Sequence, residues 1–149
     1  MKHILFLGYI LLSLAPATAQ IQTDYSLLPE PVKRFFPVVY HLPDSVNVEW
    51  SIEDTIFVAK FLSDAYPVEV RMKANGFWVI TLWDIEPSFL PAAITLFCQT
   101  EYPDASIQRC RLTNNPFDEQ RYVIVMQPFD PGASSFKLYF TTSGKPLQE

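Results

Sequence analysis

His41 is the residue in this sequence best suited to acid–base chemistry, because an imidazole ring exchanges protons near neutral pH. It could serve as the general base for a serine nucleophile, with Ser45 or Ser51 as the candidate. Their spacing matches no known nucleophile elbow, and the motif Gly-x-Ser-x-Gly is absent. A single histidine in a loop after a helix is more often a surface or capping residue. We therefore predict no catalytic residue and no enzymatic activity.

A metal site would need several histidine, cysteine or carboxylate ligands that converge on one point. The sequence offers His41 near Asp44, and Glu53 beside Asp54, at ordinary turn positions. Such pairs are typical of solvated loops, so we predict no metal and no cofactor. The sixteen acidic residues make accidental carboxylate pairs easy, and the sequence alone leaves open a pair of the kind used in glycoside hydrolysis.

The first nineteen residues have the pattern of a secretory signal peptide. Lys2 supplies a positive charge, residues 4–14 are mostly apolar, and residues 17–19 form a small-residue cleavage site. This apolar stretch is too short to cross a membrane, which needs about 20 residues. We predict that residues 1–19 are cleaved and that the protein is periplasmic or secreted, with no stable membrane insertion afterwards.

Cys98 and Cys110 are the only cysteines, and an exported protein meets oxidising conditions. A disulfide between them would close a loop of about 13 residues and contribute roughly 3 kcal/mol in the chain-entropy model. The alternative is two separately buried thiols, because a free cysteine behaves as a small apolar residue. A redox-active pair is not expected, since no Cys-x-x-Cys spacing is present.

The composition argues against nucleic acid as a partner. The net charge is −5 and the eleven lysines and arginines are scattered, whereas phosphate binding needs a basic stripe. Aromatic residues make up 15% of the chain and there are only four glycines, which favours strands with large core side chains. The length corresponds to one domain, which we place at residues 20–149.

Two parts of the chain resemble each other at a spacing of about sixty residues. Leu28-Pro29 opens a pattern that ends at Phe35, and Leu90-Pro91 opens the same pattern, which ends at Phe97. Residues 42–44, 57–61 and 68–76 parallel residues 102–104, 122–126 and 136–144. These parallels predict two copies of one unit, at about 27–86 and 87–149, in which Cys98 and Cys110 correspond to Phe36 and Trp50.

Each unit is predicted to begin with a helix and to continue as strands. The first helix is indicated by apolar residues at helical spacing: Val32, Phe35, Phe36 and Val39. Pro37 should kink or end it. The second helix has Ser88 as a candidate N-cap and one apolar stripe: Leu90, Ala93, Ile94, Phe97 and Cys98.

Strands are expected at residues 46–52, 55–62, 67–73, 77–84, 106–113, 120–127, 135–141 and 145–147. The predicted fold class is therefore α+β, with two tandem repeats of one helix followed by a four-stranded antiparallel sheet.

The hairpin at residues 73–77 allows two registers. A two-residue turn at Asn75-Gly76 would pair Lys73 with Trp78 and mix charge with core. A three-residue loop with a left-handed Gly76 is preferred, because it places Val68, Val70, Met72, Trp78, Ile80 and Leu82 on one face. The opposite face then holds Glu69, Arg71, Lys73, Phe77, Val79, Thr81 and Trp83.

That second face is our candidate partner-binding surface, since one helix layer cannot cover both faces of a sheet. Phe77 and Trp83 would be aromatic anchors with Val79 between them, and Arg71 and Lys73 a polar rim that attracts an acidic partner segment. The alternative is that these aromatic residues fill a gap between the two units or lie under a loop.

A series of short patterns runs along the chain in a fixed order: Leu28-Pro29 with Phe35, Val48-x-Trp50, Phe57 with Phe61, Gly76-Phe77-Trp78, Ile85 leading to Leu90-Pro91, Tyr102-Pro103 and Tyr122. In these residues the chain resembles the PepSY-like family of exported bacterial proteins, whose fold is similar to that of the β-lactamase inhibitor protein. The patterns span roughly residues 27–147. The chain departs from the usual pattern at Pro37 and in the connection at 114–119. The resemblance implies a two-repeat α+β domain without catalytic residues, associated with protein or peptide interaction and sometimes inhibition.

Together these observations predict an exported, non-enzymatic binding module that recognises a protein or peptide of the cell envelope through an exposed sheet face, with inhibition of that partner as one form of the function. The alternative function is a small-molecule or lipid-binding pocket between helix and sheet, which the aromatic content favours.

Overall fold

The computed structural model describes residues 21–42 and 46–148. The predicted leader, and Pro43 and Asp44 of the first predicted turn, lie outside these residues. Two α-helices are present in the described residues, α1 (Glu30–Tyr40) and α2 (Ala92–Glu101), and each follows a short 3-10 turn, η1 (Tyr25–Leu27) or η2 (Pro87–Phe89). The strands are β1 (Ile21–Thr23), β2 (Glu49–Glu53), β3 (Ile56–Ser63), β4 (Tyr66–Lys73), β5 (Trp78–Ile85), β6 (Ala105–Asn114), β7 (Arg121–Pro128), β8 (Phe136–Thr141) and β9 (Pro146–Leu147).

The predicted fold class, with a separate four-stranded sheet in each of two repeats, is wrong. All nine strands form one antiparallel sheet in chain order, because β5 pairs with β6 from Thr81 and Asn114 to Ile85 and Cys110. An edge strand leaves backbone N–H and C=O groups unpaired. Pairing β5 with β6 satisfies two edges that separate sheets would have left open, and β1 adds a strand that the sequence pattern did not indicate.

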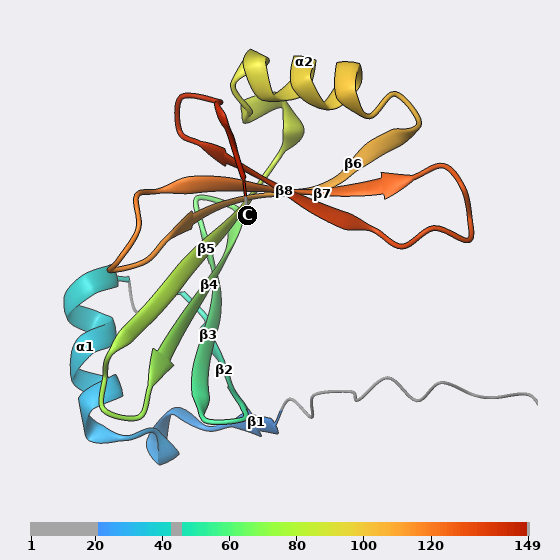
Figure 1. The fold of residues 1–149 in the computed structure, drawn as a ribbon. Helices are drawn as coiled ribbons and strands as arrows, with labels where there is room; N and C mark the ends of the chain where they lie inside the picture. Colours follow the sequence, from blue (N-terminus) through green and yellow to red (C-terminus); the bar gives the residue numbers. More distant parts are fainter. Residues whose placement is uncertain (1–20, 43–45, 149) are drawn as a thin grey trace, which may run out of the picture.

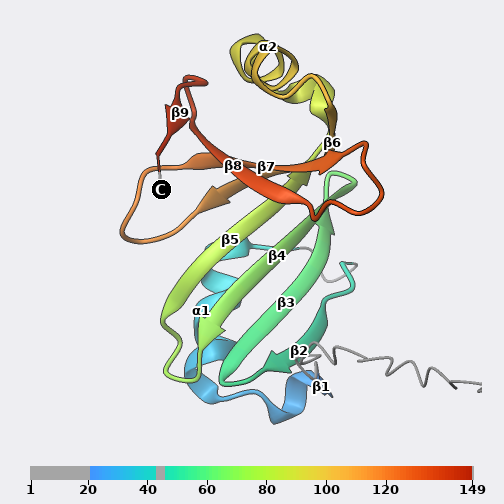
Figure 2. The same cartoon turned by 45° about the vertical axis from the view of Figure 1, so that its right-hand side comes forward.

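Both helices lie on the same face of this sheet. Trp83 and Ile85 point to one side of β5 because strand side chains alternate. Trp83 packs against the buried cluster under α1, and Ile85 packs against the buried cluster under α2. Figure 1 shows α1 beside the β2 to β5 half and α2 over the other half, and Figure 2 shows the two halves turned steeply relative to each other. We call the opposite side the helix-free face.

Each helix covers its own hydrophobic core. The cluster under α1 consists of Leu28, Val32, Phe36, Trp50, Ala59, Phe61, Val68, Val70 and Met72. The cluster under α2 consists of Leu90, Ile94, Cys98, Cys110, Ile124, Met126 and Phe140. The burial of these apolar side chains is the main favourable contribution to folding, at about 25 cal/mol per Å² removed from water.

The helix ends differ from the expectation in two places. Helix α1 continues for three residues past Pro37 and ends where His41 adopts a left-handed conformation, with φ of 42°. Proline removes one backbone donor from the helix, and the burial of Val32 and Phe36 on the sheet offsets this cost. Helix α2 begins at Ala92 rather than after Ser88, which lies in η2.

The turn between β4 and β5 has the predicted three-residue loop. Gly76 has φ of +80°, and its N–H donates to the carbonyl of Lys73 at 2.9 Å. Met72 pairs with Trp78 directly beyond the turn, as the preferred register requires. The left-handed conformation at this position is one that glycine adopts without steric cost.

The register predicted for the rest of β5 is wrong. The pairing shifts after Met72, so that Arg71 pairs with Ile80 and Val79 becomes the extra residue of a β-bulge. One extra residue reverses the alternation of side chains. Trp83 therefore faces the core under α1, and Leu82 faces the helix-free side together with Arg71.

A buried hydrogen-bond network accounts for this register. The hydroxyl of Thr81 accepts a hydrogen bond from Trp78 Nε1 at 2.9 Å and is also hydrogen-bonded to the hydroxyl of Tyr40 at the end of α1. Thr81 is completely buried. A buried hydroxyl without partners would cost free energy, so these bonds favour the register that turns Thr81 toward α1.

We expect Gly76→Ala to lower the free energy of unfolding by about 1–3 kcal/mol. An added Cβ would sit in left-handed backbone and lie 2.9 Å from the carbonyl oxygen of Pro31 in α1. The matched control is Gly132→Ala, whose Cβ would meet only Asp130 Oδ1 at 3.6 Å. Urea unfolding followed by circular dichroism measures both variants, and equal stability of the two would contradict this account of the turn.

Candidate binding site on the helix-free face

The strand pairing and side-chain alternation determine which charged residues share the helix-free face. The basic residues are Lys60, Arg71, Lys73, Arg109, Arg111, Arg121 and Lys137, and the acidic residues are Glu49, Glu53, Glu69 and Asp84. Among the strand residues this face therefore has more basic than acidic side chains, although the whole chain has a net charge of −5.

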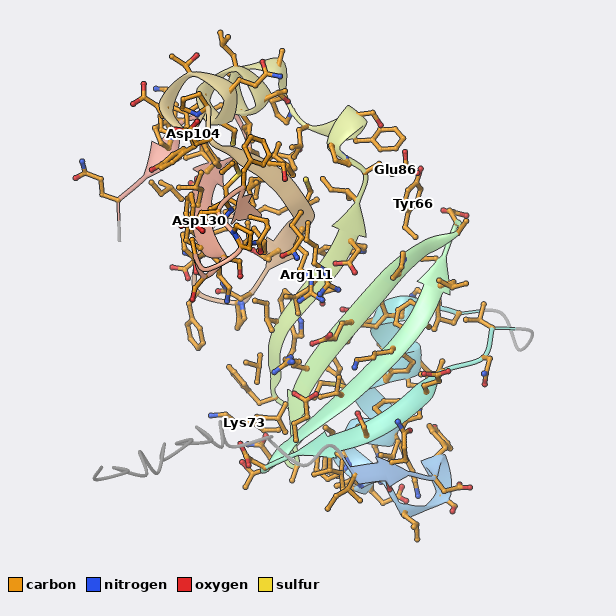
Figure 3. The ribbon with its side chains drawn as sticks, turned by 90° about the vertical axis from the view of Figure 1, so that its right-hand side faces the viewer. Tyr66, Lys73, Glu86, Asp104, Arg111 and Asp130 are labelled. Carbon is orange, nitrogen blue, oxygen red and sulfur yellow. The ribbon has the colours of Figure 1, made fainter. Side chains whose placement is uncertain are left out.

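Six of these side chains form a continuous series of ion pairs across β2, β4, β5 and β6. The series joins Arg71 Nη2 to Glu53 Oε2 (3.0 Å), Arg71 Nε to Glu69 Oε1 (2.6 Å), Arg111 Nη2 to Glu69 Oε2 (3.8 Å), Arg111 Nε to Asp84 Oδ1 (2.6 Å) and Arg109 Nε to Asp84 Oδ1 (3.0 Å). Figure 3 shows Arg111 where the two halves of the sheet meet. The series links the strands of both halves through their side chains.

Asp84 is the residue that connects the two arginines of β6 to β5. Its carboxylate accepts hydrogen bonds from both Arg109 and Arg111. Partial burial alone would raise the pKa of Asp84, but these hydrogen bonds and the nearby positive charges outweigh burial and hold the pKa below its usual range. The hydrogen bond to Asp84 likewise raises the pKa of Arg109.

The charged side chains also cover apolar sheet surface. Val58 points to the helix-free face, yet its exposed fraction is 0%. Its cross-strand neighbours are Ser51, also buried, and Arg71. Because no helix lies on this side, the aliphatic stems of the surrounding long side chains exclude water from Val58.

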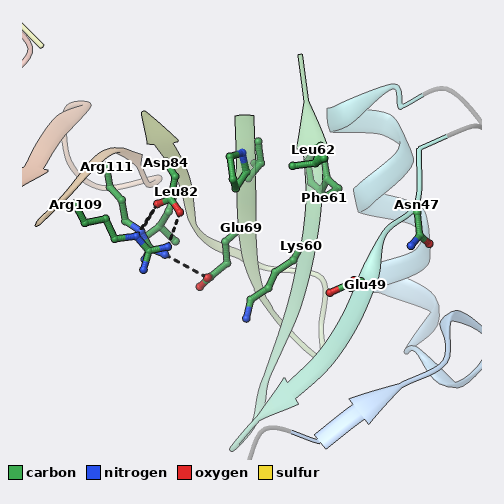
Figure 4. Close-up of a pocket in the computed structure, with 12 residues that line it drawn as sticks. Asn47, Glu49, Lys60, Phe61, Leu62, Glu69, Leu82, Asp84, Arg109 and Arg111 are labelled. Carbon is green, nitrogen blue, oxygen red and sulfur yellow. Dashed lines mark hydrogen bonds and ion pairs between the residues drawn. The ribbon is translucent and has the colours of Figure 1, made fainter. Parts of the chain in front are cut away.

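A cavity of about 480 Å³ opens on this face beside the ion pairs (Figure 4). It is lined by residues of β2 to β6 and of the segment before β2: Asn47, Glu49, Lys60, Phe61, Leu62, Pro67, Val68, Glu69, Leu82, Asp84, Arg109 and Arg111. Leu62 is 60% exposed and presents an apolar surface next to the charged groups. The site combines a few charged groups with apolar lining, as ligand-binding clefts commonly do.

The structure does not bring the five predicted partner-binding residues together on one face. Arg71 and Lys73 lie on the helix-free face, and Val79 is half-buried in the β-bulge. Trp83 packs against the core under α1.

The fifth residue, Phe77, already has contacts within the chain. It is 40% exposed at the hairpin tip, where its ring stacks on Phe117 with centroids 5.8 Å apart and lies under the Lys73 ammonium. Phe77 and Trp83 therefore do not form one anchor pair.

Of the residues that line the cavity, only Glu69 was predicted from the sequence to lie on the binding face. Arg109 and Arg111 alternate on one strand, as do Lys60 and Leu62, and this spacing places each pair on a single face. That signal was available in the sequence. The sequence did not indicate which strands lie next to each other on this face, because that depends on the pairing of β5 with β6 and on the bulge at Val79.

Cys98 and Cys110 lie in the same buried cluster under α2, each with an exposed fraction of 2%. The structure has both as free thiols. Burial raises the pKa of both thiols, and burial together with the neighbouring Cys98 raises the pKa of Cys110 to about 11. The predicted disulfide stays a prediction.

Neither a metal centre nor a membrane span is found within residues 21–42 and 46–148. No three histidine, cysteine, aspartate or glutamate side chains in these ranges are grouped so that they could hold a metal ion. In the same ranges, neither helix has the length and apolar character that crossing a membrane requires.

Comparison with known proteins identifies structural neighbours but no family. No family model and no curated protein matches the sequence. A DUF2874 family protein from Bacteroides uniformis shares 20% identity, with a TM-score of 0.69 over 80% of this chain and 86% of that one. A β-lactamase-inhibitor-protein-like (BLIP-like) protein from Bacteroides fragilis shares 19%, with a TM-score of 0.67 over 81% and 84%.

A candidate periplasmic protein from Bacteroides eggerthii is similarly close, with 20% identity and a TM-score of 0.67 over 81% of this chain and 86% of that one. At such identities the likeness shows the fold alone. The BLIP-like fold implied by the family resemblance is supported, whereas membership of the PepSY-like family is not shown.

We expect Asp84→Asn to lower the free energy of unfolding at pH 7 by about 1–3 kcal/mol, because two arginines lose their charged acceptor. A carboxylate with a lowered folded-state pKa stabilises the fold above its unfolded pKa of about 3.9. That stability is lost as the pH falls through the lower folded value. The difference between the variant and the original chain should therefore disappear in strong acid.

The control for this measurement is Asp64→Asn, an exposed aspartate in the β3 to β4 turn. Urea unfolding between pH 2 and pH 7 should show little change for this control. An Asp84→Asn difference that stays constant over the same range would contradict the role given to the Asp84 charge.

We expect the reduced, folded protein to react with a thiol reagent at pH 8 at least about 100-fold more slowly than the unfolded protein. A pKa near 11 leaves Cys110 with little thiolate at this pH, and burial blocks access to both thiols. Mass spectrometry after timed alkylation measures the rates. Rapid labelling of the reduced, folded chain would contradict the burial of the two thiols. In a sample that has not been reduced, the absence of any reactive thiol after unfolding would establish the disulfide.

Proposed function

We propose that this protein is an exported, non-enzymatic binding module that holds a segment of another protein on the helix-free face. The observation that carries the proposal is the cavity beside the ion-pair series, with Leu62 exposed at its edge. Both helices occupy the other side of the sheet, so a partner can approach this face without displacing either core.

The fold supports a protein partner. One structural neighbour bears the name BLIP-like, which describes that protein, and the shared fold makes recognition of a protein, including as an inhibitor, a reasonable function for this chain. A non-catalytic role is consistent with the surroundings of the titratable groups, since Asp84 and Glu69 are engaged by arginines and His41 ends α1.

We also propose that the chain is exported through cleavage after residue 19 and acts in the periplasm or outside the cell. The pattern of residues 1–19 and the candidate periplasmic neighbour support this location. We also propose that residues 20–149 form a single domain. Its two parts, 27–86 and 87–149, are proposed to be copies of one repeated unit, and the presence of one helix and one core in each part supports this repeat.

A second candidate function is the binding of a small apolar molecule or lipid. A cavity of about 510 Å³ lies between α2 and the strands β8 and β9, with the rings of Phe97 and Tyr102 in its lining. This cavity lies apart from the helix-free-face cavity and shares no lining residue with it.

The test of the proposed function is affinity capture from a cell-envelope extract with the chain 20–149 and two matched variants. Leu62→Asp places a charge on the helix-free face, and Leu96→Asp makes the same change at a similarly exposed residue of α2. We expect a captured protein to be retained by Leu96→Asp and lost by Leu62→Asp, because only the first leaves the binding face intact.

Circular dichroism confirms beforehand that both variants are folded. A partner that both variants retain, or that only Leu96→Asp loses, would contradict the proposed face. Repeated extracts without any partner would favour the second candidate function.

A further inference from the structure

We infer that the partner segment is acidic, with a carboxylate that reaches Lys60 and an apolar side chain two residues away that rests on Leu62. This inference rests on the proposed function and names the chemistry of the segment. It follows from which charges of the helix-free face are already paired, and from the spacing of the unpaired groups along β3.

The acidic groups of the face are largely occupied within the chain. Glu53, Glu69 and Asp84 are all ion-paired with arginines. Glu49, the fourth acidic residue, is exposed. Among the described residues, a basic ligand would find only Glu49 without an ion pair and would have to break existing pairs to bind the other three acidic groups.

Two basic groups keep donors for a ligand. Lys60 lines the cavity, and among the residues that the structure describes its ammonium has no ion pair. The register places Lys60 between Glu49 and Glu69. Glu69 is bound by arginines, and a surface pair between Lys60 and Glu49 would contribute little, so a ligand could displace it. Arg109 binds Asp84 through Nε and Nη2 only, and its side chain is 48% exposed. Its remaining guanidinium nitrogen can donate to an incoming carboxylate.

The apolar part of the site stands at a fixed distance from Lys60. Leu62 lies two residues further along β3 on the same face, and its cross-strand neighbour is Pro67, which also lines the cavity. In an extended segment, side chains at positions i and i+2 also point to one side, about 6.8 Å apart. An aspartate or glutamate separated by one residue from a leucine or aromatic residue therefore matches Lys60 and Leu62.

The net charge of the whole chain limits which acidic ligands can bind. A net charge of −5 opposes long polyanions, which bind through extended basic stripes. A short segment that carries one or two carboxylates needs only the local basic groups, and its attraction should weaken as salt is added.

The experiment is the selection of random dodecapeptides displayed on phage against the immobilised chain 20–149. We expect selected sequences to contain an acidic residue two positions from a large apolar residue. A fluorescent copy of the best peptide is then titrated against the original chain and its variants, with fluorescence anisotropy as the readout.

Lys60→Gln should weaken this peptide about tenfold, since one charge-assisted contact is lost. Replacing the acidic residue of the peptide by its amide should cause a similar loss. Lys145→Gln, an exposed lysine of the β8 to β9 turn, is the matched control and should leave the affinity within about twofold. Lys60→Met, which keeps the aliphatic stem, is the second variant if Lys60→Gln fails to give a folded protein.

The possible failures of the inference and of the proposed function are distinguishable. Peptides that Lys60→Gln does not weaken, but that Leu62→Ser does, would overturn the acidic specificity and leave the binding face in place. Peptides that neither substitution affects, or the absence of any selected peptide, would count against both.

Discussion

At the centre of the sheet, β5 pairs with β6, and Asp84 on β5 lies between Arg109 and Arg111 on β6. The backbone pairing joins two halves that each have a hydrophobic core under one helix. The ion pairs lie on the opposite face of the same strands. One junction therefore determines both the continuity of the sheet and the arrangement of charge on the helix-free face.

The position of the helices follows from the same junction. Side chains alternate along β5, and residues paired between β5 and β6 point to the same side of the sheet. The cores of both halves therefore lie on one side, which α1 and α2 cover, and the other side stays open. On the open side, long charged side chains replace a helix as the cover for Val58. The same side chains border the cavity, so the surface that completes the fold is also the surface that we propose for partner binding.

The sequence predicted local features better than the way in which they combine. Alternating apolar residues indicated strands close to β2 to β9, and Asn75-Gly76 indicated the turn before β5. The bulge at Val79 was not predictable, because Val79 and Ile80 are both apolar and either could have faced the core. The hydrogen bonds of Thr81 decide between them, and they depend on Tyr40, a residue of a distant helix.

The same limitation applied to the site. Trp83 was a reasonable surface anchor only in the register without a bulge, whereas the roles of Glu69 and Asp84 depend on their ion pairs with arginines.

Hydrogen exchange of the backbone amides of 81–85 and 110–114 tests the central junction most directly. These segments should exchange as slowly as β3 and β4 in the interior of the sheet. Exchange as fast as that of the edge strands β1 and β9 would contradict the single continuous sheet on which the binding face depends.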